Sequence, residues 1–578
     1  MPVEVESGIS ENHVYIDPWP LKITIPANIQ VVDRDTYLYV YEENVTVPLK
    51  HGGILRCNVY RPKDSDCTQR CLVLVICGPY GKDFPYKTFH PSSFSELNPE
   101  YQTEQSAWET PTPKYRISHG YAVSAATAEA FCDTIEWASQ QPWSNGKVGL
   151  LGVSYYAISQ WQVAARNPKG LAACVPWEGS SDSYNKSTRH GGILSNAFFN
   201  WWYPRQVLSN QYGRPGKTAR GWGFDTLDVD LSKEELKANR SPVLESMHLQ
   251  RFRGDEFFLS TAIDFDKIKV PILSVASLGG IMLHLRGNYL RFISGRHDLP
   301  FYYHEEVEDQ RSFLDAFLKG QGRKGWLTKG TVPPVSLLLR KGNKGVNISK
   351  TGMTFKRRAE NEWPLARTQY TKFFLTPDFE LSFQDPGIKN AIDQLPPDVI
   401  QFRTQSFREE TEITGHIVAH LNVSLGKDKE GNTPSDIDLF LSIRHISPTG
   451  EGINYTGSAG DFVPISKGWL RVSLRKTNPD HPSHRPWLPW RDFYRSDVQT
   501  VNPQKISPVD VEIWPMNVVV EAGGRLVLEI SSRNTAGIGI WGHTDPNDRS
   551  PVTFKGVNHI HFGPKYINYV SLPVILSQ

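Results

Sequence analysis

Hydrophobic and polar positions along the first half of the chain predict strands that alternate with helices. Residues 72–76 form a continuous apolar run, Leu-Val-Leu-Val-Ile, which ends at the turn Gly78-Pro79. Such runs are typical of strands buried on both faces of a parallel sheet. Similar runs cover 148–151, 171–175, 270–275 and 290–293, and helical spacing covers 129–140, 158–165 and 307–318. This alternation predicts βαβ units and an α/β fold.

Three other segments follow different patterns. Residues 44–62 alternate around His51-Gly52-Gly53, which predicts a β-hairpin ahead of the sheet. Between residues 176 and 261 the strand signal disappears and aromatic residues gather, which favours an inserted helical cap. Further on, short alternating runs are separated by Gly, Pro, Asn and Asp, a pattern typical of an antiparallel sandwich. These runs lie at 417–423, 437–443 and 526–530.

The expected organisation therefore has three parts. An α/β domain covers residues 1–175 and 262–325, the cap covers 176–261, and a C-terminal β-sandwich covers 326–578. The length of 578 residues agrees, because single hydrophobic cores rarely extend beyond a few hundred residues.

Composition narrows the class of protein. The formal net charge is +2 with scattered Lys and Arg, so neither nucleic acid nor an anionic membrane is expected as a partner. The N-terminal residues lack the pattern of a secretory signal, and no apolar run reaches the ~20 residues of a membrane span. The six cysteines contain no Cys-x-x-Cys pair, which favours reduced thiols in a cytoplasmic protein with no zinc site.

The strongest chemical signal is Gly152-Val153-Ser154-Tyr155, between a predicted strand and a predicted helix. A nucleophile elbow needs small residues at this turn, because its backbone is strained and other backbone comes close. The turn exposes the serine hydroxyl, and N–H groups at the helix N-terminus can stabilise an oxyanion. The alternative for a bare Gly-x-Ser is a helix-capping serine. Tyr156 also departs from the generic Gly-x-Ser-x-Gly.

The elbow and three further segments resemble the cocaine-esterase and X-prolyl dipeptidyl-peptidase family of α/β-hydrolases. Residues 143–149 (WSNGKVG) are similar to the segment ahead of the family's Gly-x-Ser-Tyr-x-Gly elbow, although Ala157 stands at the last Gly. Residues 79–82 (PYGK) resemble the family's Pro-Tyr-x-Lys motif, and residues 313–320 its closing helix. The resemblance covers the chain from about Asn44 onward. It implies an α/β-hydrolase domain with an inserted cap and a C-terminal jelly-roll.

The resemblance also implies roles for individual residues. Ser154 would be the nucleophile, and Tyr80 would donate its hydroxyl to an oxyanion hole shared with the N–H of Tyr155. The base would be His297, which follows the strand-like residues 290–293 and precedes the closing helix. Its competitors are His284 and His304. Neither a metal nor an organic cofactor is expected.

The acid departs from the family pattern. Members usually place an Asp after the strand that corresponds to residues 272–275, but this chain reads Ala-Ser-Leu-Gly-Gly at 276–280. The substitute that we expect is Glu178, at the end of the strand next to the nucleophile's strand, within hydrogen-bond reach of His297. The alternative for Glu178 is a carboxylate that only lines the cap junction. Asp182 and Asp298 are weaker candidates.

Two connections are shorter than the family pattern. Residues 124–128 replace an Asp-x-Arg-Gly-rich strand and loop, and Gly287-Asn288 replaces a helix. Parallel strands need a crossover of about a dozen residues or more, so each shortening threatens a βαβ unit. The chain is therefore either a natural degenerate variant or the product of a mis-spliced or mis-predicted transcript.

These observations leave three functions open. The first is a serine hydrolase or acyl transferase that acts on a small-molecule ester or amide through an acyl-serine intermediate. The second is a non-catalytic homologue that serves as a binding or scaffold protein. The third is an X-prolyl aminopeptidase, which would need an anionic pocket for a substrate N-terminus. A homo-oligomer is also left open.

Overall fold

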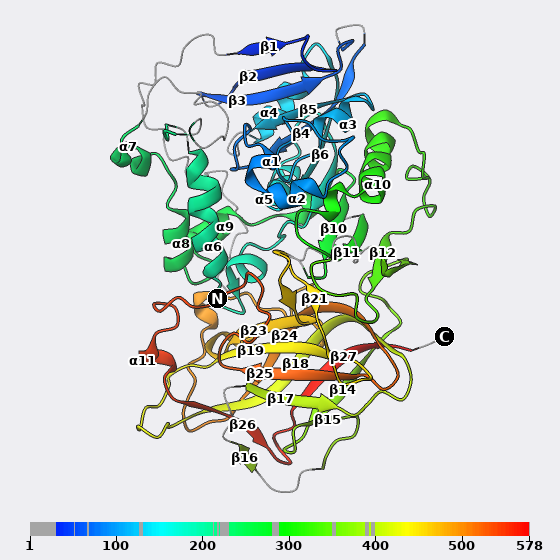
Figure 1. Cartoon of the computed structure of the whole chain (residues 1–578). Helices are drawn as coiled ribbons and strands as arrows, with labels where there is room; N and C mark the ends of the chain where they lie inside the picture. The colour runs from blue at the N-terminus through cyan, green and yellow to red at the C-terminus, as the bar shows by residue number, and fades with distance from the viewer. Residues whose placement is uncertain are drawn as a thin grey trace, which may run out of the picture.

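The computed structural model shows an α/β part packed on a β-sandwich, with a mainly helical segment along one side (Figure 1). The structure describes residues 30–50, 52–65, 69–126, 131–211, 213–216, 219, 231–279, 288–348, 354–387, 392–394 and 399–576. His51, Cys67 and His284 lie outside the described residues, as do Thr127, Ala128 and Gly287 of the two shortened connections.

An eleven-stranded mixed sheet forms the centre of the first part. In spatial order its strands are β1 (Val31–Asp33), β2 (Val40–Pro48), β3 (Ile54–Arg61), β5 (Tyr121–Ala126), β4 (Cys71–Cys77), β6 (Ser144–Val153), β7 (Leu171–Trp177), β10 (Leu273–Ser277), β11 (Tyr289–Ile293), β12 (Val335–Leu339) and β13 (Lys356–Glu360). The pairs from β5 to β12 are parallel, and the outer pairs are antiparallel. The predicted hairpin is confirmed as β2 and β3.

Helices cover both faces of this sheet, as the buried apolar runs predicted. Val73 and Val75 on β4 pack toward α4 (Phe131–Ser139) and α5 (Tyr155–Ala164). Leu72 and Leu74 point the other way, toward α10 (His304–Leu314). Because successive side chains of a strand point to opposite faces, one apolar run supplies two cores.

Two findings differ from the sequence-based expectations. The sheet continues past residue 325, where the α/β domain was expected to end, because β12 pairs in parallel with β11 and β13 then pairs with β12. The shortened connections do not prevent strand pairing. Strand β5 pairs with β4 over Tyr121–Ala126, and β11 pairs with β10 over Tyr289–Ile293.

The segment between β7 and β10 is mainly helical in its described residues. It contains α6 (Ala197–Trp202), α7 (Lys233–Ala238), α8 (Val243–Leu249) and α9 (Glu256–Ser260), with a short hairpin of β8 (Arg189–His190) and β9 (Ile193–Leu194). Figure 1 shows α6, α8 and α9 beside the α/β part and reaching toward the sandwich. No helix in the described part of the chain is long and apolar enough to cross a membrane.

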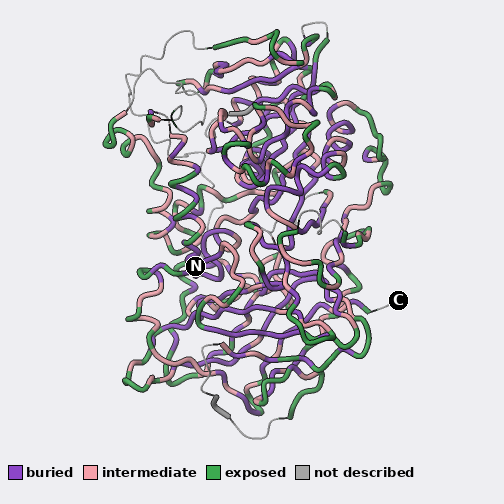
Figure 2. Tube along the Cα trace, viewed as in Figure 1, coloured by how far each residue is buried: buried purple, intermediate pink, exposed green. Residues whose placement is uncertain are grey.

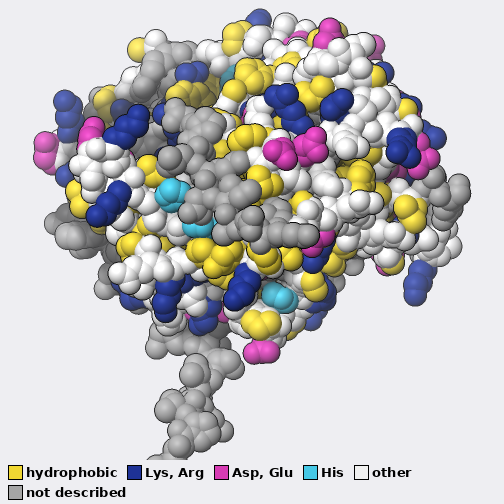
Figure 3. Space-filling view, turned by 90° about the horizontal axis from the view of Figure 1, so that it is seen from below, with side chains coloured by type: hydrophobic (Ala, Val, Ile, Leu, Met, Phe, Trp, Pro, Cys, Tyr) yellow, Lys and Arg dark blue, Asp and Glu magenta, His cyan; other side chains and the backbone are white. Residues whose placement is uncertain are grey.

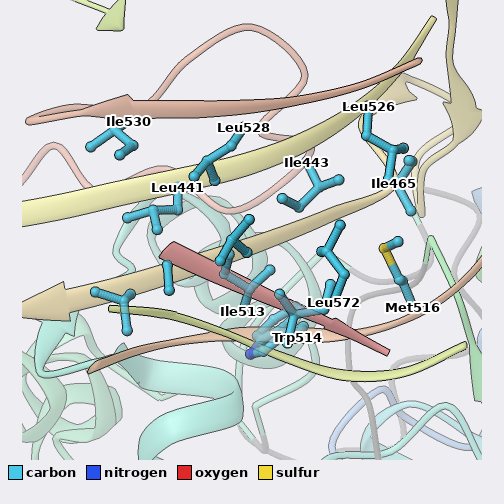
Figure 4. Packing of buried hydrophobic residues seen from close by; sticks show 14 of the residues in the cluster. Leu441, Ile443, Ile465, Ile513, Trp514, Met516, Leu526, Leu528, Ile530 and Leu572 are labelled. Carbon is cyan, nitrogen blue, oxygen red and sulfur yellow. The ribbon is translucent and has the colours of Figure 1, made fainter. Parts of the chain in front are cut away.

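The second part is a twelve-stranded, largely antiparallel sheet that closes on itself, since β27 (Tyr569–Ile575) pairs with both β14 (Thr368–Leu375) and β18 (Thr411–Gly426). The predicted runs at 417–423 and 526–530 lie within β18 and β25 (Arg525–Ser531), and the run at 437–443 begins one residue before β19 (Asp438–Ile446). Side chains that point into the sandwich from several strands pack against one another in its core (Figure 4).

The helical segment and the sandwich share a buried contact. Buried residues fill the centre of the α/β part and of the sandwich, and further buried residues lie where the sandwich meets the rest of the molecule (Figure 2). There His190 of β8 stacks on Trp469 of the sandwich, with ring centroids 4.6 Å apart. On the face seen from the sandwich end, Lys and Arg side chains are spread out with Asp and Glu among them (Figure 3).

Candidate active site

Ser154 lies in the sharp turn between β6 and α5, as the elbow motif predicted. Its φ and ψ are 63° and −121°, a conformation that costs free energy for any residue other than glycine. The turn leaves no room for a side chain at Gly152, where a Cβ would lie 2.7 Å from that of Tyr156. Ala157 replaces the family's last glycine, and it faces Gly179, whose missing Cβ leaves space for it. The sequence therefore forms an elbow despite its departures.

Tyr80 lies beside the elbow, just after β4, and is almost fully buried. Burial raises the pKa of Tyr80 well above its usual value, and the charge of Glu109 adds to the rise, while hydrogen bonding with Ser154 and Trp202 opposes it. The phenol therefore keeps its proton and can act as a donor. Tyr155 is the first residue of α5, so its N–H lies at the N-terminus of that helix.

Glu178 and His297 form a buried pair. Glu178 follows β7 directly, and its Oε2 lies 2.9 Å from Nδ1 of His297, in the loop after β11. The carbonyl oxygen of the neighbouring Trp177 accepts a 2.9 Å hydrogen bond from the N–H of Ser154, so the elbow is tied to the residue beside Glu178. Burial raises the pKa of Glu178, and the adjacent imidazole opposes that shift.

The other candidates interact elsewhere. Asp298 accepts a 2.9 Å hydrogen bond from the hydroxyl of Tyr86, and Asp182 forms an ion pair with Arg253. His304 starts α10 and contacts Tyr101. Position 279, in the stretch where the family's acid is usual, packs against the sandwich: a Cβ there would lie 2.2 Å from the carbonyl oxygen of Thr456. That position therefore cannot hold a larger side chain without a shift of the backbone.

A third buried acid was not predicted. Glu109 is 0% exposed, and its Oε1 lies 3.4 Å from Nε2 of His297, on the ring edge opposite Glu178. Its carbonyl oxygen accepts a 3.2 Å hydrogen bond from the N–H of Val153, next to Ser154. No periodic pattern or motif marks Glu109, because the long segment between β4 and β5 carries it into the site.

The sandwich takes part in the site through backbone contacts. The N–H of His297 donates a 3.0 Å hydrogen bond to the carbonyl oxygen of Ser458. The Ser458 hydroxyl in turn donates to the carbonyl oxygen of Gly279, 3.5 Å away. The histidine loop is thus held by a turn that belongs to the C-terminal part of the chain.

Within the described ranges there is no group of three or more His, Cys, Asp or Glu side chains arranged to hold a metal ion. The described cysteines, Cys57, Cys71, Cys77, Cys132 and Cys174, are free thiols. The residues that surround Ser154 offer acid–base and hydrogen-bonding chemistry.

Two family models match the chain. Residues 115–291 match the X-Pro dipeptidyl-peptidase (S15) family, and residues 329–571 match the X-Pro dipeptidyl-peptidase C-terminal non-catalytic domain. The first match includes the elbow and Glu178, and the second begins near the start of β12.

Similar proteins agree in length and fold. Cocaine esterase of Rhodococcus sp. (strain MB1 Bresler) is 23% identical over 93% of this chain and 99% of its own. The crystal structure of a CocE/NonD family hydrolase from Staphylococcus aureus aligns with a TM-score of 0.76 at 23% identity, covering 94% of this chain and 96% of its own. An α-amino-acid ester hydrolase aligns with a TM-score of 0.61 at 17% identity, covering 96% and 100%. The chain belongs to the cocaine-esterase and X-Pro dipeptidyl-peptidase (S15) family of α/β-hydrolases and is a serine hydrolase of ester or amide bonds.

Proposed function

We propose that the chain hydrolyses a small-molecule carboxylic ester through an acyl-enzyme on Ser154. The observation that carries this proposal is the strained elbow tied by a backbone hydrogen bond to the His297–Glu178 pair. The name of the cocaine esterase relative supports an ester over an amide.

In this mechanism the Ser154 hydroxyl attacks the carbonyl carbon and Nε2 of His297 takes its proton. Glu178 holds the Nδ1–H tautomer and balances the charge of the imidazolium. Tyr80 and the N–H of Tyr155 stabilise the oxyanion. Nε2 makes no hydrogen bond to a described residue. Such catalytic hydrogen bonds often tighten only when substrate binds.

The position of Glu178 bears on the non-catalytic alternative. A serine hydrolase whose catalytic imidazole lacks an orienting carboxylate loses up to ~10⁴ in turnover. The 2.9 Å contact with Glu178 supports a complete triad in which the acid has moved to the end of β7. The main sequence-based argument for a scaffold role is therefore weakened.

Ser154→Ala tests the proposal. The variant should lose nearly all turnover of an aryl ester and all labelling by a fluorophosphonate. Ser260→Ala, whose hydroxyl contacts only the backbone of its own helix, should keep both. Labelling that persists at another serine would contradict the assignment, and a wild-type chain that neither labels nor turns over would favour the binding role.

Substrate class and reaction type need separate measurements. Comparison of aryl esters with X-Pro arylamides distinguishes an esterase from an X-prolyl aminopeptidase. An added alcohol distinguishes hydrolysis from acyl transfer, because a transferase forms the new ester. We also propose a cytoplasmic location, supported by the free described cysteines. Cell fractionation would test this.

A further inference from the structure

Glu109 is a buried carboxyl group that the triad does not use. Both of its side-chain oxygens are buried and lack a hydrogen-bond partner among the described residues. Its backbone is held on both sides: Val153 donates to its carbonyl oxygen, and the N–H of Thr110 donates to the hydroxyl of Tyr302, 3.1 Å away. Its φ of 60° is uncommon for a residue other than glycine. The fold thus fixes an unpaired carboxyl group inside the site.

The carboxyl group of Glu109 faces Nε2 of His297, the nitrogen that reacts in the proposed mechanism. Oε1 of Glu109 lies 3.4 Å from Nε2, and Nε2 has no hydrogen-bond partner among the described residues. Because Nδ1 contacts Glu178, Nε2 is the atom left to accept the proton of Ser154. Glu109 therefore shares the reacting edge of the imidazole with the nucleophile.

The surroundings of Glu109 disfavour its charged form. Glu178 and Asp298 act on it as neighbouring acids. Four phenols also lie within electrostatic reach, and each keeps its proton because burial raises its pKa: Tyr80, Tyr86, Tyr156 and Tyr302. Apart from His297, these titratable groups supply no positive charge. Burial raises the pKa of Glu109 well above its usual range, and Asp298 and Glu178 raise it further.

We propose that Glu109 is a neutral carboxylic acid that faces Nε2 of His297 during turnover, and that its ionisation sets the alkaline limit of activity. This inference rests on the proposed function. It adds a second carboxyl group to the reacting edge of the histidine, with a role distinct from that of Glu178.

The proton balance is simple. In attack, the proton of the Ser154 hydroxyl moves to Nε2, and the imidazolium N–H can donate to the carbonyl oxygen of Glu109 until the leaving group takes that proton. Glu109 keeps its own proton throughout. When Glu109 ionises, a negative charge stands near Tyr80, where the oxyanion develops, and the barrier rises.

Glu109→Gln tests the inference through the pH dependence of kcat/KM on an aryl ester. Glutamine keeps the shape, a donor and an acceptor, but cannot ionise. Because Glu109 lies on the reacting edge of His297, kcat/KM is taken relative to its own value at neutral pH for wild type and for the variant. The alkaline limb of the variant should be lost or moved to higher pH. An unchanged alkaline limb would overturn the inference.

The matched control is Glu306→Gln. Glu306 is also buried with a pKa raised by burial, but it lies on α10 and pairs with Arg357, so this variant should keep the wild-type alkaline limb. A loss in Glu109→Gln restricted to esters that carry a free amine would overturn the inference too, because it would make Glu109 an anionic binding group.

A measurement independent of activity separates this inference from the proposed function. Infrared spectra at neutral pH should contain a protonated-carboxyl band that disappears in Glu109→Gln and remains in Ser154→Ala. If Ser154→Ala retains turnover while the band is present, Ser154 is not the nucleophile, but the inference that Glu109 is neutral remains valid. If no such band depends on Glu109, the inference is wrong whatever the activity.

Discussion

Three residues of the site share an unusual backbone conformation. Ser154, Glu109 and Glu178 have φ values of 63°, 60° and 48°. Residues other than glycine rarely adopt positive φ, and such conformations persist only where the surrounding structure fixes them. In each case the backbone is fixed by hydrogen bonds to a neighbouring strand, so the side chain points into the site instead of following the strand it adjoins.

Tyr80→Phe removes only the hydroxyl of the proposed oxyanion donor. Loss of one such donor typically costs ~10²–10³ in turnover, so kcat on an aryl ester should fall by about that factor. Fluorophosphonate labelling of Ser154 should still occur, since the nucleophile and base are intact. An unchanged kcat in a folded variant would contradict the role.

Glu178→Gln keeps the volume of the side chain but removes its charge. The imidazolium then loses its counter-charge and its fixed tautomer, and kcat should fall by up to ~10⁴. Steady-state kinetics on the same ester measure this. Asp298→Asn is the comparison, because Asp298 contacts Tyr86 and not the ring of His297. If Asp298→Asn lost more activity than Glu178→Gln, the acid would be wrongly assigned.

The raised pKa of Glu109 predicts how the stability of the protein changes with pH. This pKa is raised in the folded state, so the folded protein holds a proton that the unfolded chain releases near the ordinary carboxyl value. Its contribution to stability is therefore present below that value and is lost as the pH rises toward the folded pKa. The Tm of Glu109→Gln should exceed that of wild type increasingly from neutral to alkaline pH. Equal Tm values across this range would argue against burial of an ionisable group.

At the scale of elements, the elbow depends on the close approach of β6 and α5. Gly152→Ala would place a methyl group 2.7 Å from Cβ of Tyr156, and overpacking of this kind costs about 1–3 kcal/mol. Denaturant unfolding should show that loss, together with reduced kcat. Gly452→Ala is the control, since a Cβ at that position meets nothing within 4 Å. Equal stability of the two variants would show that the elbow can open without cost.

Elements with strong periodicity were predictable from the sequence, and loops that cross the site were not. The runs at 72–76 and 171–175 became β4 and β7 because two-sided burial demands continuous apolar residues. Glu178 could be placed by topology, since it follows a strand end beside the nucleophile's strand. Glu109 could not, because irregular backbone with long-range contacts positions it. The extension of the sheet to β13 was not predicted, because all residues after 325 were assigned to the sandwich from the pattern of short alternating runs.

At the scale of the whole molecule, a buried ion network joins the helical segment to the sandwich. Asp548 lies between Arg189 of β8 and Arg471 of the sandwich, at 2.8 and 3.0 Å. Burial works against the charged carboxylate, but the two guanidinium groups dominate and hold the pKa of Asp548 well below its usual range. Its stabilising contribution is present above the unfolded carboxyl pKa and is lost as the pH falls toward the folded value.

Asp548→Asn should therefore destabilise the protein. Removal of one partner from a buried pair leaves uncompensated charge and costs about 3–5 kcal/mol. Denaturant unfolding at neutral pH should show this loss, and the difference from wild type should shrink in acid. Glu430→Gln, which breaks an exposed pair with Lys555, should change the midpoint little. A pH-independent difference would mean that packing, not charge, explains the effect.

The hydrogen bond from His297 to Ser458 has a consequence for how the two halves of the gene evolve. The position of His297, the proposed base, is set in part by a turn that the C-terminal half of the gene encodes. Recombination that exchanges sandwiches between relatives would produce chimaeras that fold yet work slowly, unless the turn at residues 456–458 travels with its matching histidine loop. The two halves are therefore expected to evolve as a linked pair, with compensating changes at Gly279 and Thr456, where the two backbones pack closely.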